Sequence, residues 1–417
     1  MTTRRELLTG LGLTPILAAI SRRAAAAQGT AAELARDETF WSTVARAFTV
    51  DRSLVNFNNG GVSPSPAVVQ EALARDLAFA NEAPAYTMWE LLEPRREAVR
   101  ARLAATFGCD PEEVAITRNA SEGLEICQLG LDLVPRDEVL TTTHDYPRMI
   151  AAFRQRQRRD GIVLRQVALP VPAGDADEVV HLFARNLTAR TRLILVSHMV
   201  NVTGQILPVR RIVELGRRHG IPVLVDGAHS FAHFPFQRDE LGCDLYATSL
   251  HKWLFAPFGT GMLSVRRSEI ARLWPLMAAP EHLDHDIRKF EEIGTHPCPN
   301  FLAIAEALTF HETIGAERKS ARLVHLRDRW AQRLAQDPRI RLLTSLGPGQ
   351  ACGIATMAVR GIEPEELARH LFERHRILVA PIRRDRLVGI RVSPSVYSTI
   401  AEVDRFSTAI EEILAAG

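Results

Sequence analysis

The sequence lacks the features that mark several classes of protein. Its 417 residues include few cysteines, none in a CxxC pair: Cys109, Cys127, Cys243, Cys298 and Cys352. An odd and dispersed set in a long chain predicts no disulfide framework. The charges nearly cancel, with 51 basic and 49 acidic residues, so neither nucleic acid nor an acidic membrane surface is indicated as a partner. The hydrophobic share of 46% is enough to bury one large core or two joined cores.

A long hydrophobic run is also missing. The apolar stretch over residues 7–20 is too short to span a bilayer. Arg4 and Arg5 precede it, and a second basic pair followed by four alanines comes after it. This pattern resembles a twin-arginine (Tat) export signal, with an ordinary amphipathic helix as the alternative. We therefore expect a Tat-type signal peptide over residues 1–27, an N-terminal segment over residues 28–55, and a periplasmic or otherwise exported protein.

From residue 56 onward, short apolar runs alternate with helix-patterned segments. The strand candidates are residues 114–117, 139–142, 162–164, 193–196, 222–225, 244–247 and 261–265. The alternation predicts an α/β domain over residues 56–280, with a mostly parallel seven-stranded sheet covered by helices on both faces. A long helical stretch over residues 300–334 and two later strand candidates predict a smaller α+β domain over residues 281–417.

Two strand candidates end in residues suited to catalysis. Asp226 closes one of them, and the segment Thr248-Ser249-Leu250-His251-Lys252 closes another. Ligands of such sheets bind beyond the carboxyl ends of the strands. Pyridoxal 5′-phosphate (PLP) needs a lysine for a Schiff base and a carboxylate for its pyridine nitrogen, and both types are present here. Taken singly, the aspartate fits a helix N-cap equally well, and the lysine fits a solvated loop.

A phosphate site is predicted where Thr117-Arg118-Asn119-Ala120-Ser121-Glu122 follows a strand and opens a helix. Backbone N–H groups at a helix N-terminus and a serine hydroxyl bind anions. Simple capping of the helix by Ser121 is the alternative, and the two look identical in sequence.

With these motifs the chain resembles the class V aminotransferases, a family of fold-type I PLP enzymes, from about Asn56 to the C-terminus. The resemblance is nearest to the isopenicillin N epimerase-like branch. It implies PLP on Lys252, Asp226 at the pyridine nitrogen and His229 beside the ring oxygen, all three as catalytic residues. The implied cofactor-binding residues are Asn119, Ala120, Ser121, Tyr146, Asn201, Asp226, His229, Ser249, His251, Lys252 and Thr260. The implied substrate-binding residues are Arg391, for the α-carboxylate, and Asn58.

The resemblance also implies a small-molecule amino-acid substrate and a homodimer with shared active sites, because Gly259-Thr260-Gly261 looks like the loop that reaches a neighbouring subunit's phosphate. The segment over residues 380–387, read as a loop, lacks the catalytic cysteine of desulfurases. Its arginines could meet an acidic substrate side chain, although a solvated loop is favoured. No metal is expected, because the HxxH at His282 and His285 has no third ligand motif.

The expected function is therefore chemistry at the α-carbon of an amino acid through a Lys252 Schiff base. Transamination and isopenicillin N epimerase-like epimerisation are ranked equal, since both use the same core residues. A PLP-dependent C–S or C–C lyase is one alternative. A non-catalytic protein that keeps the fold as a binding module is the other, and Asp226, Lys252 and Arg391 all argue against it.

Overall fold

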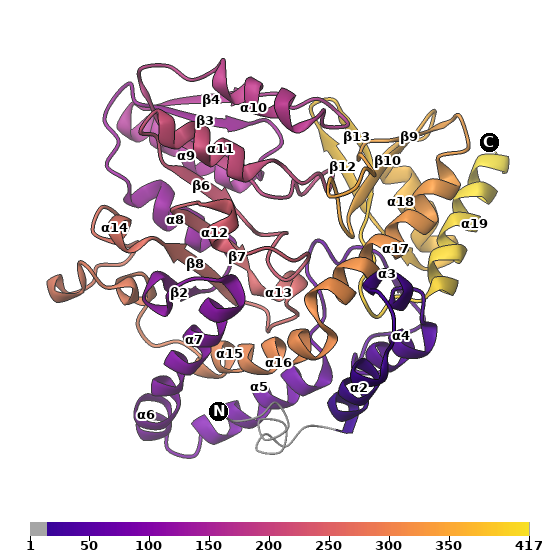
Figure 1. The fold of residues 1–417 in the computed structure, drawn as a ribbon, viewed down its shortest axis with the longest axis horizontal. Coiled ribbons are helices and arrows are strands. Elements are labelled where there is room, and N and C mark those ends of the chain that lie inside the picture. The colour runs from indigo at the N-terminus through magenta and orange to yellow at the C-terminus, as the bar shows by residue number, and fades with distance from the viewer. Residues whose placement is uncertain (1–14, 417) are drawn as a thin grey trace.

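The computed structural model describes residues 15–416, and its centre is a seven-stranded sheet (Figure 1). The strands are β2 (Val114–Thr117), β3 (Glu138–Thr142), β4 (Val163–Val167), β5 (Thr191–Ser197), β6 (Val223–Asp226), β7 (Leu245–Ser249) and β8 (Gly261–Val265). Their order across the sheet is β2-β8-β7-β6-β5-β3-β4. Only β8 runs antiparallel, pairing with β2 on one side and β7 on the other. The predicted mostly parallel sheet is confirmed.

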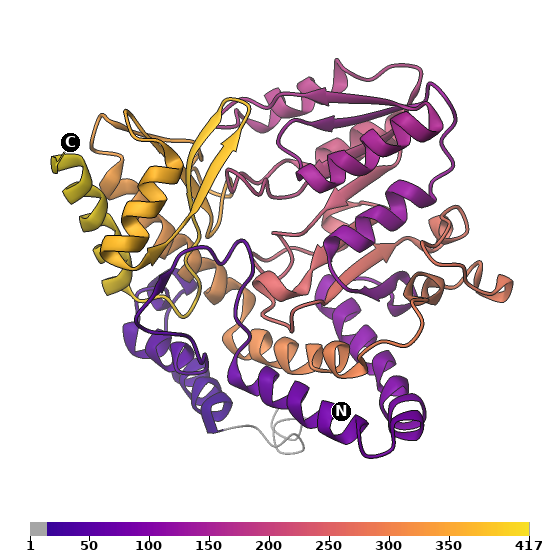
Figure 2. The same ribbon diagram turned by 180° about the vertical axis from the view of Figure 1, so that it is seen from behind.

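Both faces of this sheet are buried, because alternate residues of each strand point to opposite sides. On one side, Leu193 and Leu195 of β5 pack in a core with α8 (Ala120–Gly130) and α9 (Pro147–Asp160). On the other side, Ile194 and Val196 pack in a core with four helices: α5 (Ala67–Ala80), α7 (Arg96–Phe107), α10 (Ala176–Ala184) and α11 (Val209–Arg218). Figure 2 shows the sheet from behind, on the side opposite to that of Figure 1.

The helical stretch predicted over residues 300–334 is broken into three pieces: α15 (Cys298–Leu302), α16 (Ile304–Ile314) and α17 (Ala316–Leu334). The break before α17 is at Gly315, whose φ of +90° is open to glycine but strained for other residues. Helices α15 and α16 pack against α5 and α7, so the helical cover of the large sheet continues past residue 280. The domain boundary expected there stays a prediction.

The C-terminal part is built on a four-stranded antiparallel sheet, in the order β12-β13-β10-β9. The strands are β9 (Ile340–Leu342), β10 (Ala355–Val359), β12 (Ala380–Arg384) and β13 (Leu387–Val392), and α18 (Pro364–His375) and α19 (Ile400–Ala416) complete the unit. The reading of residues 380–387 as a loop is wrong, because β12 and β13 form a hairpin over this segment. The segment contains a proline and four charged residues, which are uncommon in strands, so its pattern did not predict β12. The partner strand β13 follows directly in the chain.

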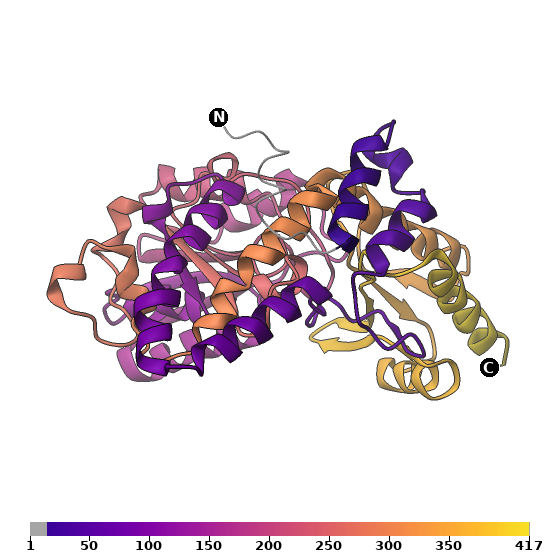
Figure 3. The same cartoon turned by 90° about the horizontal axis from the view of Figure 1, so that it is seen from below.

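The N-terminal segment forms helices that lie along the C-terminal part and α16, as the view from below shows (Figure 3). Helix α2 (Pro15–Ala26) packs against α4 (Glu38–Ala45) and α16, and its Leu17 and Ile20 are buried. Arg4 and Arg5 lie outside the described residues, and export by the Tat route stays a prediction. Within residues 15–416, no helix has the length and hydrophobicity needed to cross a bilayer.

Candidate active site

The candidate site lies where β5, β6 and β7 end. The register pairs Ser197 of β5 with Asp226 of β6, and Asp226 with Ala247 of β7. The carboxyl ends of these parallel strands therefore form one edge, with neighbouring strands about 4.8 Å apart. Lys252 follows β7 in the short helix α13 (Leu250–Trp253) and reaches the same edge. The two residues singled out in the sequence are thus brought together by the sheet.

Lys252 is held in a setting that favours its neutral amine. Its Nζ lies 3.1 Å from Nε2 of His229. Burial lowers the pKa of Lys252 to about 8; the positive charge of Arg391 adds to this effect, and the carboxylate of Asp226 opposes it. A neutral amine is the nucleophilic form of lysine, so this shift suits covalent attachment of a carbonyl compound.

Trp253 determines which nitrogen of His229 carries the proton. The indole Nε1–H of Trp253 donates to His229 Nδ1 over 3.4 Å, and an indole N–H can only donate. Burial holds the pKa of His229 well below its usual range, so the ring is neutral and has a single proton. That proton is therefore on Nε2, from which it points to Lys252 Nζ. The amine of Lys252 accepts this bond, which is possible only for the neutral form.

Asp226 is a buried carboxylate at the end of β6, and its Oδ1 accepts the N–H of Ala228 over 2.9 Å. Burial raises the pKa of Asp226 to about 6, although the Ala228 N–H and the charge of Lys252 both act to lower it. A buried carboxylate with a raised pKa is stabilised by any cation placed beside it. A protonated ring nitrogen is such a cation.

The start of α8 is prepared for an anion. Asn119 is the N-cap of this helix, and its Oδ1 accepts the N–H of Glu122 over 2.9 Å. The alternative in which Ser121 caps the helix is therefore wrong. Ala120 donates its N–H to Ser249 Oγ over 3.0 Å, which brings the hydroxyl after β7 to the helix N-terminus. Gly261 packs on this turn so closely that an added Cβ would lie 2.5 Å from the Cα of Asn119.

Arg391 is a buried arginine without an acidic partner among the described residues. Its Nη1 donates to the carbonyl of Asn201 over 2.9 Å, and its Nη2 donates to Asn58 Oδ1 over 2.8 Å. Its Nε is buried without a partner, and no carboxylate within residues 15–416 forms a salt bridge with it. Burial, reinforced by the charge of Arg384, lowers its pKa to about 10. Arg391 and Asn58, both expected to bind substrate, are in direct contact.

The segment after β3 contains a residue that the sequence reasoning missed. Asp145 is buried, and its Oδ2 accepts bonds from the end of β3, while its Oδ1 accepts the N–H and hydroxyl of Ser197 over 2.9 and 2.7 Å. This carboxylate ties the ends of β3 and β5 together and so positions Tyr146, which begins α9 as its N-cap. The signal was its place three residues past the end of β3, close to the strand-end position that identified Asp226.

The remaining predicted residues line the same edge. The ring of His251 bonds the carbonyl of Thr260 over 3.1 Å, and the hydroxyl of Thr260 donates to Pro257 over 2.7 Å. Asn201 has a side-chain oxygen that is buried without a partner within the described residues. Across residues 15–416, no group of three or more histidine, cysteine or acidic side chains is arranged to hold a metal ion.

These residues fit PLP. The orphaned amide of Asn201 and the ring of His229 suit its ring hydroxyl, Asp226 suits its pyridine nitrogen, and Lys252 suits its aldehyde. The α8 N-terminus, with Ala120, Ser121 and Ser249, suits its phosphate because backbone N–H groups at a helix start bind anions.

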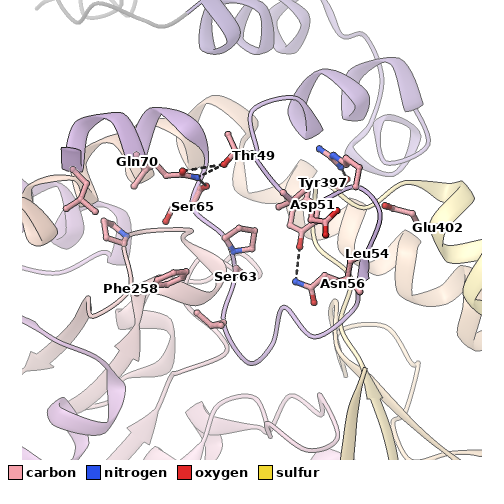
Figure 4. A pocket seen from close by; sticks show the side chains of 17 residues that line it. Thr49, Asp51, Leu54, Asn56, Ser63, Ser65, Gln70, Phe258, Tyr397 and Glu402 are labelled. Atoms are coloured by element: carbon pink, nitrogen blue, oxygen red, sulfur yellow. Dashed lines mark hydrogen bonds between the residues drawn. The ribbon is translucent and has the colours of Figure 1, made fainter. Parts of the chain in front are cut away.

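A cavity of about 700 Å³ opens beside this site, between the chain around Asn56 and the loop at Phe258 (Figure 4). Ser63 connects it to the site, since its N–H donates to the carbonyl of His251 over 3.2 Å. On the other wall, the hydroxyl of Tyr397 contacts Asn56 and Asn59. The exposed ring of Phe258 borders the opening.

Comparison of the sequence with known proteins shows the family to which the chain belongs. The model of the aminotransferase class-V family matches residues 55–406. Isopenicillin N epimerase of Streptomyces clavuligerus is 30% identical over 393 residues, which cover 89% of this chain and 98% of the relative. A probable cysteine desulfurase of Mycolicibacterium paratuberculosis is 27% identical over 88% of this chain and 56% of its own length.

Solved structures share the fold. A lysine-to-alanine mutant of C-DES, with glycine covalently linked to its PLP cofactor, is 25% identical and superposes with a TM-score of 0.78 over 87% of this chain and 97% of that chain. A cysteine desulfurase from Thermococcus onnurineus NA1 gives a TM-score of 0.79 at 22% identity, over 90% of this chain and 98% of that chain. The fold is that of fold-type I PLP enzymes, and PLP is the cofactor of the family.

Proposed function

This chain belongs to the class V aminotransferase family, and from that membership we propose that it catalyses epimerisation at the α-carbon of a free amino acid, with PLP as cofactor. The relative at 30% identity that supports epimerisation spans nearly the whole chain. Transamination is the second candidate, because the same residues serve it and the two reactions differ only in where the proton returns.

The observation that carries the proposal is a buried arginine without a carboxylate partner, Arg391, at the same sheet edge as Lys252. Arg391 is buried and Lys252 is half-buried, and neither forms a salt bridge within the part of the chain that the structure describes. A buried cation without a carboxylate is unfavourable by several kcal/mol unless a ligand compensates it. An amino acid carries the carboxylate that Arg391 lacks, and its Cα lies one bond from that carboxylate.

Each residue then has a defined task. PLP, when bound, supplies an electrophilic carbon for the substrate amine and a ring that accepts electrons from Cα. Asp226 keeps the ring nitrogen protonated, while the α8 N-terminus and Ser249 hold the phosphate. Arg391 orients the α-carboxylate through a fork of N–H donors, with Asn58 holding one side of its guanidinium. Lys252 removes the proton from Cα, and its lowered pKa makes the neutral base available near neutral pH.

The positions of the cysteines argue against a desulfurase that forms a persulfide on a cysteine. The hairpin over residues 380–387 contains none. Cys352 is buried, and burial raises its pKa to about 11, so its thiol is almost entirely protonated near neutral pH. A PLP-dependent C–S lyase that uses no cysteine stays an alternative, supported by the likeness to the C-DES structure.

The experiment is incubation of the cofactor-loaded protein with single L- and D-amino acids in deuterated water. Epimerisation predicts deuterium at Cα and formation of the opposite enantiomer without any keto acid. Transamination predicts products only when a keto acid is added, and a lyase releases a fragment of the side chain. Absence of Cα–H exchange for every amino acid offered would reject the proposal.

Lys252→Ala tests the mechanism directly. The chain has three lysines, Lys252, Lys289 and Lys319, and Lys289→Ala is the matched control because it removes a buried lysine whose amine donates to the carbonyl of Asp284. We expect Lys252→Ala to lower the rate of Cα–H exchange by at least about a hundredfold, since a positioned general base contributes about 10²–10⁴. Borohydride reduction followed by peptide mass spectrometry should place the cofactor on Lys252 in the wild type. A Lys252→Ala protein that exchanged at the wild-type rate would contradict the assignment.

A further inference from the structure

Arg384 is a half-buried arginine at the tip of the β12–β13 hairpin, and only one edge of its guanidinium is in use. Its Nη1 donates to the backbone carbonyls of His144 and Asp145 over 3.0 and 3.1 Å. Within residues 15–416, its Nε and Nη2 make no hydrogen bond, and no carboxylate forms a salt bridge with it. Nε and Nη2 are the two parallel donors that bind a carboxylate bidentately.

Nearby acidic groups do not fill this edge. Asp145 is the closest candidate, but both of its oxygens already accept bonds from Thr141, Thr142 and Ser197. Asp385, the next residue, is exposed to solvent. The adjacent Arg383 is different, because it pairs with Glu363 and Glu365 on the surface.

The register of the hairpin explains the difference between the two arginines. Ala380 lies opposite Arg391, and Arg384 lies opposite Leu387. Opposed residues share a face and successive residues alternate, so Arg384 lies on the face of Arg391, whereas Arg383 lies on the other. Ile382 and Leu387 mark the shared face, since both pack against the core of the large sheet. The expected solvent exposure holds for Arg383, which lies in a strand and not in a loop, and is wrong for Arg384, which is half-buried.

The two guanidinium groups are anchored beyond the ends of neighbouring strands, although their Cα atoms are about 14 Å apart along the hairpin at 3.4 Å per residue. Arg384 is anchored on the carbonyls after β3, and Arg391 is anchored on the carbonyl of Asn201, after β5. Strands β3 and β5 are hydrogen-bonded neighbours, so these two anchor points lie at the ends of adjacent strands. The charge of Arg384 contributes to the lowered pKa of Arg391, as expected for two cations that face one space.

We propose that Arg384 binds a second carboxylate at the far end of the substrate's side chain, while Arg391 binds the α-carboxylate. The substrate class is then an α-amino acid with a distal carboxylate, that is, a dicarboxylic amino acid or a longer derivative that ends in an acid. The inference rests on the proposed function, because it takes Arg391 as the α-carboxylate site.

The test is calorimetric titration of the cofactor-loaded protein with unreactive acids. Glutarate and adipate carry two carboxylates, and pentanoate and hexanoate carry one with the same number of carbons. We expect the better diacid to bind at least about tenfold more tightly than its monoacid, the range of one charge-assisted bond. Arg384→Gln should remove this advantage and leave monoacid affinity unchanged. Arg383→Gln, one residue away on the opposite face, should change neither.

A second variant separates binding from folding. Arg384→Lys keeps the charge and a donor for the carbonyls of His144 and Asp145 but lacks the fork, so it should retain the hairpin and lose most of the diacid advantage. Diacids that bind no better than monoacids, or an Arg384→Lys protein with the full advantage, would overturn the inference. Monoacid binding that is insensitive to Arg391→Gln would instead reject the α-carboxylate site, and with it the proposed function.

Discussion

Lys252, His229 and Trp253 form the unit on which the chemistry depends. Trp253 donates to one ring nitrogen of His229, and the other nitrogen is then obliged to donate to the amine of Lys252. Three residues thereby select the uncharged form of a lysine. In addition, His233 stacks on Trp253 with ring centroids 3.6 Å apart, and its Nε2 accepts the N–H of Gly353, so the indole is held in place.

This unit predicts how the rate of cofactor attachment depends on pH. Lys252 attacks as the neutral amine, so the rate should rise with pH, reach its midpoint near pH 8, the lowered pKa of this residue, and level off above it. In Trp253→Phe, His229 is free to protonate Nδ1 and accept a bond from the ammonium form. That change raises the pKa of Lys252 and moves the midpoint to higher pH. The measurement is stopped-flow absorbance of the apoprotein mixed with PLP.

Asp226→Asn is the control variant, in which we expect the midpoint of the pH dependence to move in the opposite direction. Its carboxylate stabilises the ammonium form of Lys252, so its removal should lower the pKa of the lysine and move the midpoint to lower pH. Midpoints that shift in the same direction in both variants would contradict the role given to Trp253.

Among the elements, helix α2 is packed into the fold although it lies within the segment expected to be cleaved as a signal peptide. Its Leu17 and Ile20 are buried beside α4 and α16, and the carbonyl of Ala24 accepts a bond from Arg318 over 3.0 Å. The same residues fall within the signal peptide expected over residues 1–27. Cleavage after residue 27 would remove α2 and uncover its contact surface, whereas retention would keep it as part of the fold.

We expect Ile20→Ala in the full-length chain to lower the thermal midpoint by several degrees, because truncation of a fully buried aliphatic side chain costs about 2–5 kcal/mol. The measurement is scanning calorimetry of a preparation whose intact N-terminus is verified by mass spectrometry. Arg22→Gln, on the exposed side of the same helix, should leave the midpoint unchanged. Equal midpoints for wild type and Ile20→Ala would mean that α2 adds nothing to stability.

At the level of the whole molecule, the open side of the site indicates a partner subunit. Phe258 is 62% exposed, and it directly precedes Gly259 and Thr260, the segment expected to reach a neighbouring phosphate. Val62, across the cavity opening, is 46% exposed. Apolar side chains exposed together at a site are typical of an interface. The homodimer is thus part of our proposal, with the second copy of the chain completing each site.

We predict that the protein sediments as a dimer and that Phe258→Asp shifts it toward the monomer, because an interfacial carboxylate would have to be desolvated. The same variant should bind PLP more weakly, since each phosphate would lose its contribution from the partner. Trp274→Asp is the matched control: this aromatic ring is 65% exposed but lies after α14 (Arg267–Ile270), away from the cavity. A dimeric Phe258→Asp protein with unchanged cofactor affinity would exclude this surface.

Most of the large sheet could be predicted from local pattern, because buried parallel strands are short apolar runs bounded by polar residues. Asp226 and Lys252 followed from the same rule, since a residue just past such a run lies at the ligand-binding edge. The cap of α8 could not be predicted, because Asn119 and Ser121 are both good N-caps and only the backbone geometry selects Asn119.

Contacts between distant segments were decided by the tertiary structure alone. Asn58 and Arg391 are 333 residues apart in the chain and 2.8 Å apart in space. Arg383 and Arg384 are neighbours of identical chemistry, yet one pairs with surface glutamates and the other donates to backbone carbonyls beyond the end of β3. Local sequence carries the identity of a strand end and its chemistry. Strand register, which depends on long-range pairing, decides which side chains meet there.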